Sequence, residues 1–443
     1  MPVVLRQLVE VAPTVSTWPS AARRGGIMAA LLAVGAITGH FEAGIAATTG
    51  ALNIALLDAA VPRRVLARAL WLCVITTTLV GFLAVIVGDT GWLIPLLAVL
   101  AFLQGALAGA GLAVANASIA SMITAILFSV VPGSLTEAVV LAGWLCLGAV
   151  VETVVALVAW HWERQGLVRR QVGVALEWAA RAPGGPDVQR WATAARETMG
   201  TAHLSTAERA QFERLLAIAE TPGDQPADLR SAGRRLRRIP GAPLGEGNSG
   251  RAVTALERSP AVSVDPAVGR GGRATGDRLD DLLGLLQPGT RSFQAGIRLA
   301  VLMVVGAGAV AYFAIPQGHW VLLVFALAVR ADYSGTVASL IARVIGVLAG
   351  VLLFQAVVII SDGGLVVLLL LAALSGVLTC RWLLGNATLF FAWLTVFVSV
   401  LVDIADPISP FGTQRIVATM VGAAIGLVVA VGWPGWRRAG VTS

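Results

Sequence analysis

Twelve apolar runs separated by short polar gaps dominate the chain and fall into two groups of six. A helix of about 20 apolar residues crosses the hydrocarbon core of a bilayer, and helices satisfy their own backbone polar groups there. Several runs are shorter, so the first two of each group could be half-helices. We predict an all-α polytopic membrane protein with spans at about 27–39, 43–58, 66–88, 92–108, 112–131 and 138–160, then at 297–315, 319–331, 336–360, 364–380, 386–402 and 414–433.

The basic residues indicate the orientation of these spans. All 32 are arginines, and in the first group they precede the first run and follow the second, at Arg23, Arg24, Arg63, Arg64 and Arg68. Arginine is retained in cytoplasmic loops, so arginines on alternate gaps mark the cytoplasmic side. With six spans in each group, both termini and the middle of the chain are expected on that side.

The two groups resemble each other when one is shifted by about 274 residues. Arg24 then falls on Arg298 and Asp58 on Asp332, while two further pairs match within one position, namely Arg68 with Arg343 and Asp89 with Asp362. Charged residues are scarce in such sequences. The matches therefore predict two parallel repeats of about six helices, related by an axis along the membrane normal.

Residues 162–295, between the repeats, differ in character and have no apolar run long enough to span a membrane. We expect helices at 166–182 and 206–220, and disorder at 240–275, which is rich in Gly, Pro and Ser. The predicted organisation is a cytoplasmic N-terminus (1–24), a first membrane repeat (25–161), a cytoplasmic linker domain (162–295), a second membrane repeat (296–433) and a cytoplasmic tail (434–443).

Composition excludes several classes of function. Hydrophobic residues make up 57% of the chain and charged residues 13%, so the net charge of +7 indicates contact with anionic lipid rather than with nucleic acid. The three cysteines lie singly in apolar runs, and the four histidines show no metal-ligand spacing. No hydrolase or nucleotide-binding motif occurs. We therefore expect no metal, no cofactor and no enzymatic activity.

Glu152 is the acidic residue placed deepest in the first half. An acidic side chain within a span is tolerated where it faces a cavity or a partner. Glu152 is therefore a candidate for proton coupling, and pairing between helices or a position near the cytoplasmic interface are the alternatives. Glu137 has a structural explanation instead, because Ser134 and Glu137 form a capping-box pattern at the start of the same span.

The densest group of polar residues follows the second span of each repeat. Unusually short spans at corresponding positions of two repeats are a pointer to a transporter binding site. Arg343 lies just inside the next span, where a guanidinium could hold a carboxylate through two hydrogen bonds; capping of that helix and the retention of arginine in cytoplasmic loops are the structural alternatives. The candidate binding residues are His319, Trp320, Arg330, Asp332, Tyr333 and Arg343, with Asp58 and Arg68 in the first half.

Four segments of the second half resemble the integral membrane transporter domain of the fusaric acid resistance family. They are 319–324 (HWVLLV), 330–336 (RADYSGT), 343–350 (RVIGVLAG) and 415–422 (RIVATMVG). The plan of two six-span halves around a cytoplasmic insert is similar too. The chain departs from the family at Ala418, where an acidic residue is usual, and the first half lacks the tryptophan and the R-x-x-G-x-x-x-G spacing.

The resemblance implies proton-coupled efflux of aromatic or other small organic acids across the bacterial inner membrane. The expected partners are membrane lipid and a small organic anion, and assembly into a homo-oligomer is compatible with this plan. Two alternatives stay open. One is an organic-anion channel, which would use the same arginines as an electrostatic funnel. The other is a membrane-anchored assembly or regulatory protein that acts through residues 162–295.

Overall fold

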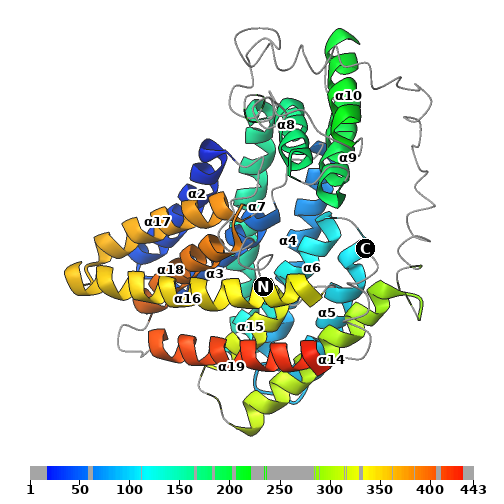
Figure 1. Cartoon of the computed structure of the whole chain (residues 1–443). Coiled ribbons are helices and arrows are strands. Elements are labelled where there is room, and N and C mark those ends of the chain that lie inside the picture. Colours follow the sequence, from blue (N-terminus) through cyan, green and yellow to red (C-terminus); the bar gives the residue numbers. More distant parts are fainter. Residues whose placement is uncertain are drawn as a thin grey trace.

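A computed structural model describes residues 17–57, 63–163, 167–181, 185–201, 206–220, 286–328 and 333–432. Within these ranges, residues 111, 289, 314, 316, 362, 384 and 406–410 are excepted. Residues 234, 236 and 284 are also described. All regular structure in this part of the chain is helical (Figure 1). Helices occupy all twelve positions where the apolar runs predict them. The predictions for 226–283, including disorder at 240–275, fall almost wholly outside the described residues.

The first half comprises α2 (Trp18–Thr38), α3 (Phe41–Leu57), α4 (Arg63–Val87), α5 (Leu93–Ala106), α6 (Leu112–Phe128) and α7 (Leu135–Glu163). Local signals set their ends. Thr17 caps α2 by accepting a hydrogen bond from the Ser20 amide, and Gly39 ends this helix with a φ of 76°. The capping box of α7 is confirmed, since the Ser134 amide donates to Glu137 Oε2 over 2.7 Å.

The second half comprises α14 (Arg291–Tyr312), α15 (His319–Ala328), α16 (Tyr333–Ser361), α17 (Leu365–Trp382), α18 (Ala387–Ala405) and α19 (Phe411–Gly432). Thr290 caps α14 by accepting from the Phe293 amide over 3.1 Å. Asn386 caps α18 in the same way, because its Oδ1 accepts from the Leu389 amide over 2.9 Å.

Seven helices of the described residues are long and apolar enough to cross a membrane, and they lie in α2, α4, α7, α14, α16, α17 and α18. Shorter apolar segments lie in α3, α5, α6 and α19. The helix α15 has only 10 residues. The protein is thus an all-helical, multi-pass membrane protein. The short second helix of each half agrees with the sequence pattern, whereas the first helix of each half, at 21 and 22 residues, is full length.

Helices α8 (Leu167–Ala179), α9 (Pro186–Thr201) and α10 (Thr206–Glu220) pack on one another around their own apolar core. Helices α8 and α10 coincide with the predicted ones, whereas α9 was not predicted. Arg196 of α9 joins them, because it donates to Glu213 over 3.0 Å and to Glu220 over 2.7 Å. These carboxylates raise the pKa of Arg196, with Glu220 contributing most.

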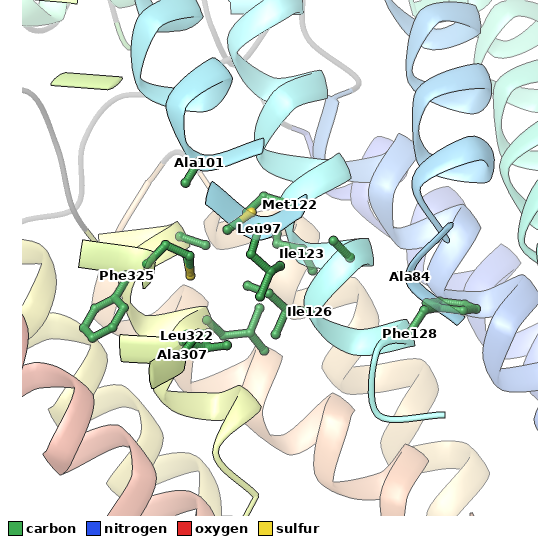
Figure 2. Packing of buried hydrophobic residues seen from close by; sticks show 14 of the residues in the cluster. Ala84, Leu97, Ala101, Met122, Ile123, Ile126, Phe128, Ala307, Leu322 and Phe325 are labelled. Carbon is green, nitrogen blue, oxygen red and sulfur yellow. The ribbon is translucent and has the colours of Figure 1, made fainter. Parts of the chain in front are cut away.

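The two halves interlock through reciprocal contacts. Helix α2 packs on α17, and α5 packs on α14. Side chains from α5, α6, α14 and α15 meet in one apolar cluster, in which Figure 2 labels, among others, Leu97, Met122, Ala307 and Phe325. The halves therefore share a hydrophobic core.

Glycines allow the closest helix contacts. A Cβ on Gly105 of α5 would lie 2.6 Å from Gly296 of α14. A Cβ on Gly346 of α16 would lie 2.7 Å from the Phe391 side chain of α18, so this glycine lets the two helices approach closely. Likewise Gly422 of α19 faces Val324 of α15. These contacts bring α15, α16, α18 and α19 together around the polar residues described next.

Candidate functional site: two buried arginines

Arg343 lies in the middle of the second half, on the face of α16 that contacts α18. Its exposed fraction is 3%. The guanidinium carbon lies 5.1 Å from the centroid of the Phe391 ring, a cation–π distance. Among the residues that the structure describes, its Nε and Nη1 atoms have no hydrogen-bond acceptor. Because a buried charged donor is costly when it lacks an acceptor, Arg343 is the strongest binding candidate.

A second buried arginine, Arg415 of α19, lies beside it. Its exposed fraction is also 3%, and its Nη2 donates to Thr395 Oγ1 of α18 over 3.3 Å. Its guanidinium stacks 4.0 Å above the Trp320 ring of α15. The two guanidinium groups lie within electrostatic range of each other. Four helices thus contribute to one cationic and aromatic cluster.

Arg415 lies in one of the family-like segments, 415–422, but no binding role was predicted for it. A signal was available, because Arg415 begins the last apolar run, next to the gap that the arginine rhythm assigns to the outer side. The positive-inside rule does not explain an arginine next to an outer loop, and a binding role would explain it.

The short helix α15 presents His319 and Trp320 to this cluster. Trp320 is buried, and its Nε1 donates to Gln317 Oε1 over 3.2 Å. Gln317, in the turn before the helix, has a φ of 56°, which side-chain-bearing residues rarely adopt. His319 interacts electrostatically with Arg415, and its ring lies 4.8 Å from that of Trp320. The structure therefore places two predicted residues, His319 and Trp320, next to the Arg343–Arg415 pair.

The other predicted site residues are placed differently. Arg330 and Asp332, like Asp58 in the first half, lie outside the described residues, and Tyr333 is described only as the first residue of α16. Arg68 is exposed on α4. A shift of 274 residues brings Arg343 onto Ala69, which is buried. One residue rotates a helical position by about 100°, so the near match in sequence does not place Arg68 where Arg343 lies.

Glu152 forms a separate polar site in the first half. Its side chain is fully buried in α7, and Oε1 accepts a hydrogen bond from Arg23 Nη1 of α2 over 2.9 Å. The partner of Glu152 thus belongs to another helix and lies 129 residues away in the sequence. The ion pair accounts for the burial of the carboxylate, and it also links two helices through a group that can be protonated.

The described residues contain no group of three or more His, Cys, Asp or Glu that could hold a metal ion. Cys73 and Cys146 are free thiols. The polar groups that converge are instead guanidinium and hydroxyl donors with aromatic rings. Such a set suits recognition of an organic anion.

Comparison with curated proteins and comparison with solved structures each gave no match to this chain. Residues 302–429 match a protein family described as "Fusaric acid resistance protein-like". The matched segment contains α15 to α18, half of α14 and most of α19, and hence every residue of the Arg343–Arg415 cluster. The resemblance inferred from the sequence motifs is thus confirmed for residues 302–429, which are similar to this family.

Proposed function

We propose that the protein is a secondary transporter of small organic acids and that Arg343 binds the carboxylate of the substrate. The observation that carries this proposal is the guanidinium of Arg343, buried among apolar helices with two N–H groups that no described residue accepts. A carboxylate would satisfy these donors and balance the charge. The Phe391 and Trp320 rings beside the two arginines favour a substrate with an aromatic part.

The family resemblance supports proton-coupled efflux of aromatic or other small organic acids across the bacterial inner membrane. Glu152 is the candidate for coupling. Protonation of its carboxylate would break the charge balance with Arg23 and loosen the contact between α2 and α7. A proton could in this way change the packing of the first half.

A parallel two-repeat architecture fits the helix contacts. The contact of α2 with α17 corresponds to that of α14 with α5, and the contacts of α4 with α6 and α7 correspond to those of α16 with α18 and α19. Glycines line both reciprocal contacts between the halves, because Gly25 of α2 approaches Val377 of α17 and Gly105 of α5 approaches Gly296 of α14. We infer that each half supplies the same six-helix unit.

Flux through proteoliposomes tests the function. The purified protein is reconstituted and supplied with a panel of aromatic acids, with and without an imposed pH gradient, and Arg343→Ala is measured alongside. We expect accumulation of an acid against its gradient, dependent on the pH gradient and lost in Arg343→Ala. Dissipative current without accumulation would indicate a channel. If neither occurs, the proposal fails and an assembly role of residues 162–295 becomes the better account.

The proposed topology places residues 1–24, 162–295 and 434–443 in the cytoplasm, because arginine follows alternate spans. A Gly247→Cys variant, made in a background without the three native cysteines, should resist a membrane-impermeant thiol reagent in intact cells. It should react once the cells are opened. Labelling from outside intact cells would contradict this orientation.

A further inference from the structure

The two buried arginines contact the same helix, α18, at two different residues. Arg343 contacts Phe391, and Arg415 donates to Thr395, both residues of α18. Phe391 and Thr395 are four residues apart, which is about one helical turn or roughly 6 Å along the axis. Each guanidinium is therefore held against a different turn of the same helix.

Aromatic rings orient both guanidinium groups. The Trp320 ring covers one face of Arg415 at 4.0 Å, and the Phe391 ring lies 5.1 Å from the guanidinium carbon of Arg343. A guanidinium that stacks on a ring through its face presents its N–H groups at its edge. Such an edge holds a carboxylate in a planar fork of two hydrogen bonds. The arrangement thus prepares two binding positions rather than one.

The Arg343–Arg415 pair places two positive charges in one cluster. Among the described residues of this half, Asp403 lies on α18 about two helical turns after Thr395. A ligand with one carboxylate would engage one of the two arginines. A ligand with two carboxylates about one helical turn apart would engage both arginines at once. Its affinity would be higher, because the second contact forms within a complex that the first contact already holds together.

We propose that the Arg343–Arg415 site takes a dianionic organic acid, with one carboxylate on each arginine. This inference rests on the proposed function and adds the charge class of the substrate. It also assigns Arg415 as a second substrate-binding residue, and Thr395 as the residue that positions its guanidinium. Arg415 then determines whether a second carboxylate is recognised, whereas Arg343 binds the first.

Benzoate and isophthalate provide a matched pair of probes, because they share the ring and differ by one carboxylate. Binding to the purified full-length protein is measured by isothermal titration calorimetry at a pH at which all carboxyls are ionised, and uptake is measured in proteoliposomes. We expect wild-type protein to bind isophthalate at least about tenfold more tightly than benzoate, since a charge-assisted hydrogen bond is worth about 1.5–3 kcal/mol. Arg415→Gln should bring this ratio close to one by weakening isophthalate alone.

Two further variants keep the test decisive if Arg415→Gln folds poorly. Thr395→Val retains both charges but releases the Arg415 side chain, and it should reduce the ratio. Arg64→Gln, at an exposed position of α4, serves as the control and should leave both affinities unchanged.

The outcomes separate this inference from the proposed function. Equal affinities for benzoate and isophthalate in the wild type, with uptake of both, would overturn the dianion assignment and leave the transporter intact. An unchanged ratio in both Arg415→Gln and Thr395→Val would do the same. If neither acid binds or is taken up, the proposed function and this inference fail together.

Discussion

The two halves of the membrane region differ in the surroundings of their buried charged groups. In the first half Glu152 and Arg24 each have a partner within the protein. Glu152 pairs with Arg23, Asn53 donates to Thr124 over 2.8 Å, and Arg24 donates to Ser20 over 2.9 Å. In the second half two arginines share one helix face with aromatic rings and a hydroxyl.

This difference distinguishes polar groups that stabilise the fold from polar groups that can bind a ligand. A polar group with an internal partner stabilises helix packing and has little left to offer a ligand. Arg343, whose Nε and Nη1 atoms have no acceptor in the described part of the chain, keeps donors for one. We therefore assign substrate recognition to the second half and coupling to the first, with the shared core between α5, α6, α14 and α15 as the physical connection.

The largest expected effect follows from changing Arg343. Arg343→Ala should abolish uptake, because it removes the charge and both hydrogen bonds that hold the carboxylate. Arg343→Lys keeps the charge that sets topology but cannot form the planar fork. Loss of one charge-assisted hydrogen bond should weaken transport at subsaturating substrate by about tenfold or more. Uptake rates at several substrate concentrations, with protein in the membrane quantified, measure both effects.

The exposed arginine Arg64 provides the matched control for these variants. Arg64→Ala removes a cation from α4 without touching the cluster and should transport like the wild type. Wild-type uptake kinetics in Arg343→Lys would show that Arg343 only stabilises the helix.

The next effect concerns the Arg23–Glu152 pair. Removing one partner of a buried ion pair costs about 3–5 kcal/mol, so Glu152→Gln alone should lower thermal stability and abolish the response to a pH gradient. The double variant Arg23→Gln/Glu152→Gln leaves no unbalanced charge and should regain much of the lost stability. Because the proton acceptor is still missing, its transport should stay insensitive to pH.

Thermal unfolding in detergent and uptake at two external pH values separate the structural role from the coupling role. If the double variant regained both stability and pH-driven uptake, Glu152 would be a packing residue. The first half would then contribute structure alone.

Local patterns in the sequence predicted most of the fold. Runs of apolar residues located twelve of the described helices, seven of which are long and apolar enough to cross a membrane, and the spacing of Ser134 and Glu137 predicted the observed capping box. The helix α9 was missed although Val188, Ala192, Ala195 and Met199 recur at helical spacing. Alanine contributes little to an apolar pattern, so a helix buried through alanines is easily overlooked.

Contacts between distant segments could not be predicted in the same way. Arg23 and Glu152 meet only because α2 packs beside α7, and the stacking of Arg415 on Trp320 depends on α19 crossing α15. For a related reason, the match of Arg68 to Arg343 in the sequence did not predict where the Arg68 side chain lies. An error of one residue matters little to a membrane span but moves a side chain to another face of the helix.

The smallest effect tests how α16 positions Arg343. A Cβ at Gly346 would lie 2.7 Å from both the Phe391 Cβ and the Thr388 carbonyl oxygen, so Gly346→Ala forces α16 and α18 apart. Overpacking of this kind costs about 1–3 kcal/mol. Gly308→Ala in α14 is the control, because no atom lies within 4 Å of the added methyl group, and removing a helical glycine should stabilise by up to about 1 kcal/mol. Thermal unfolding in detergent should therefore shift in opposite directions for the two variants. A Gly346→Ala protein as stable as Gly308→Ala would mean that the glycine contact does not hold Phe391 against Arg343, and that the site depends on other contacts of α18.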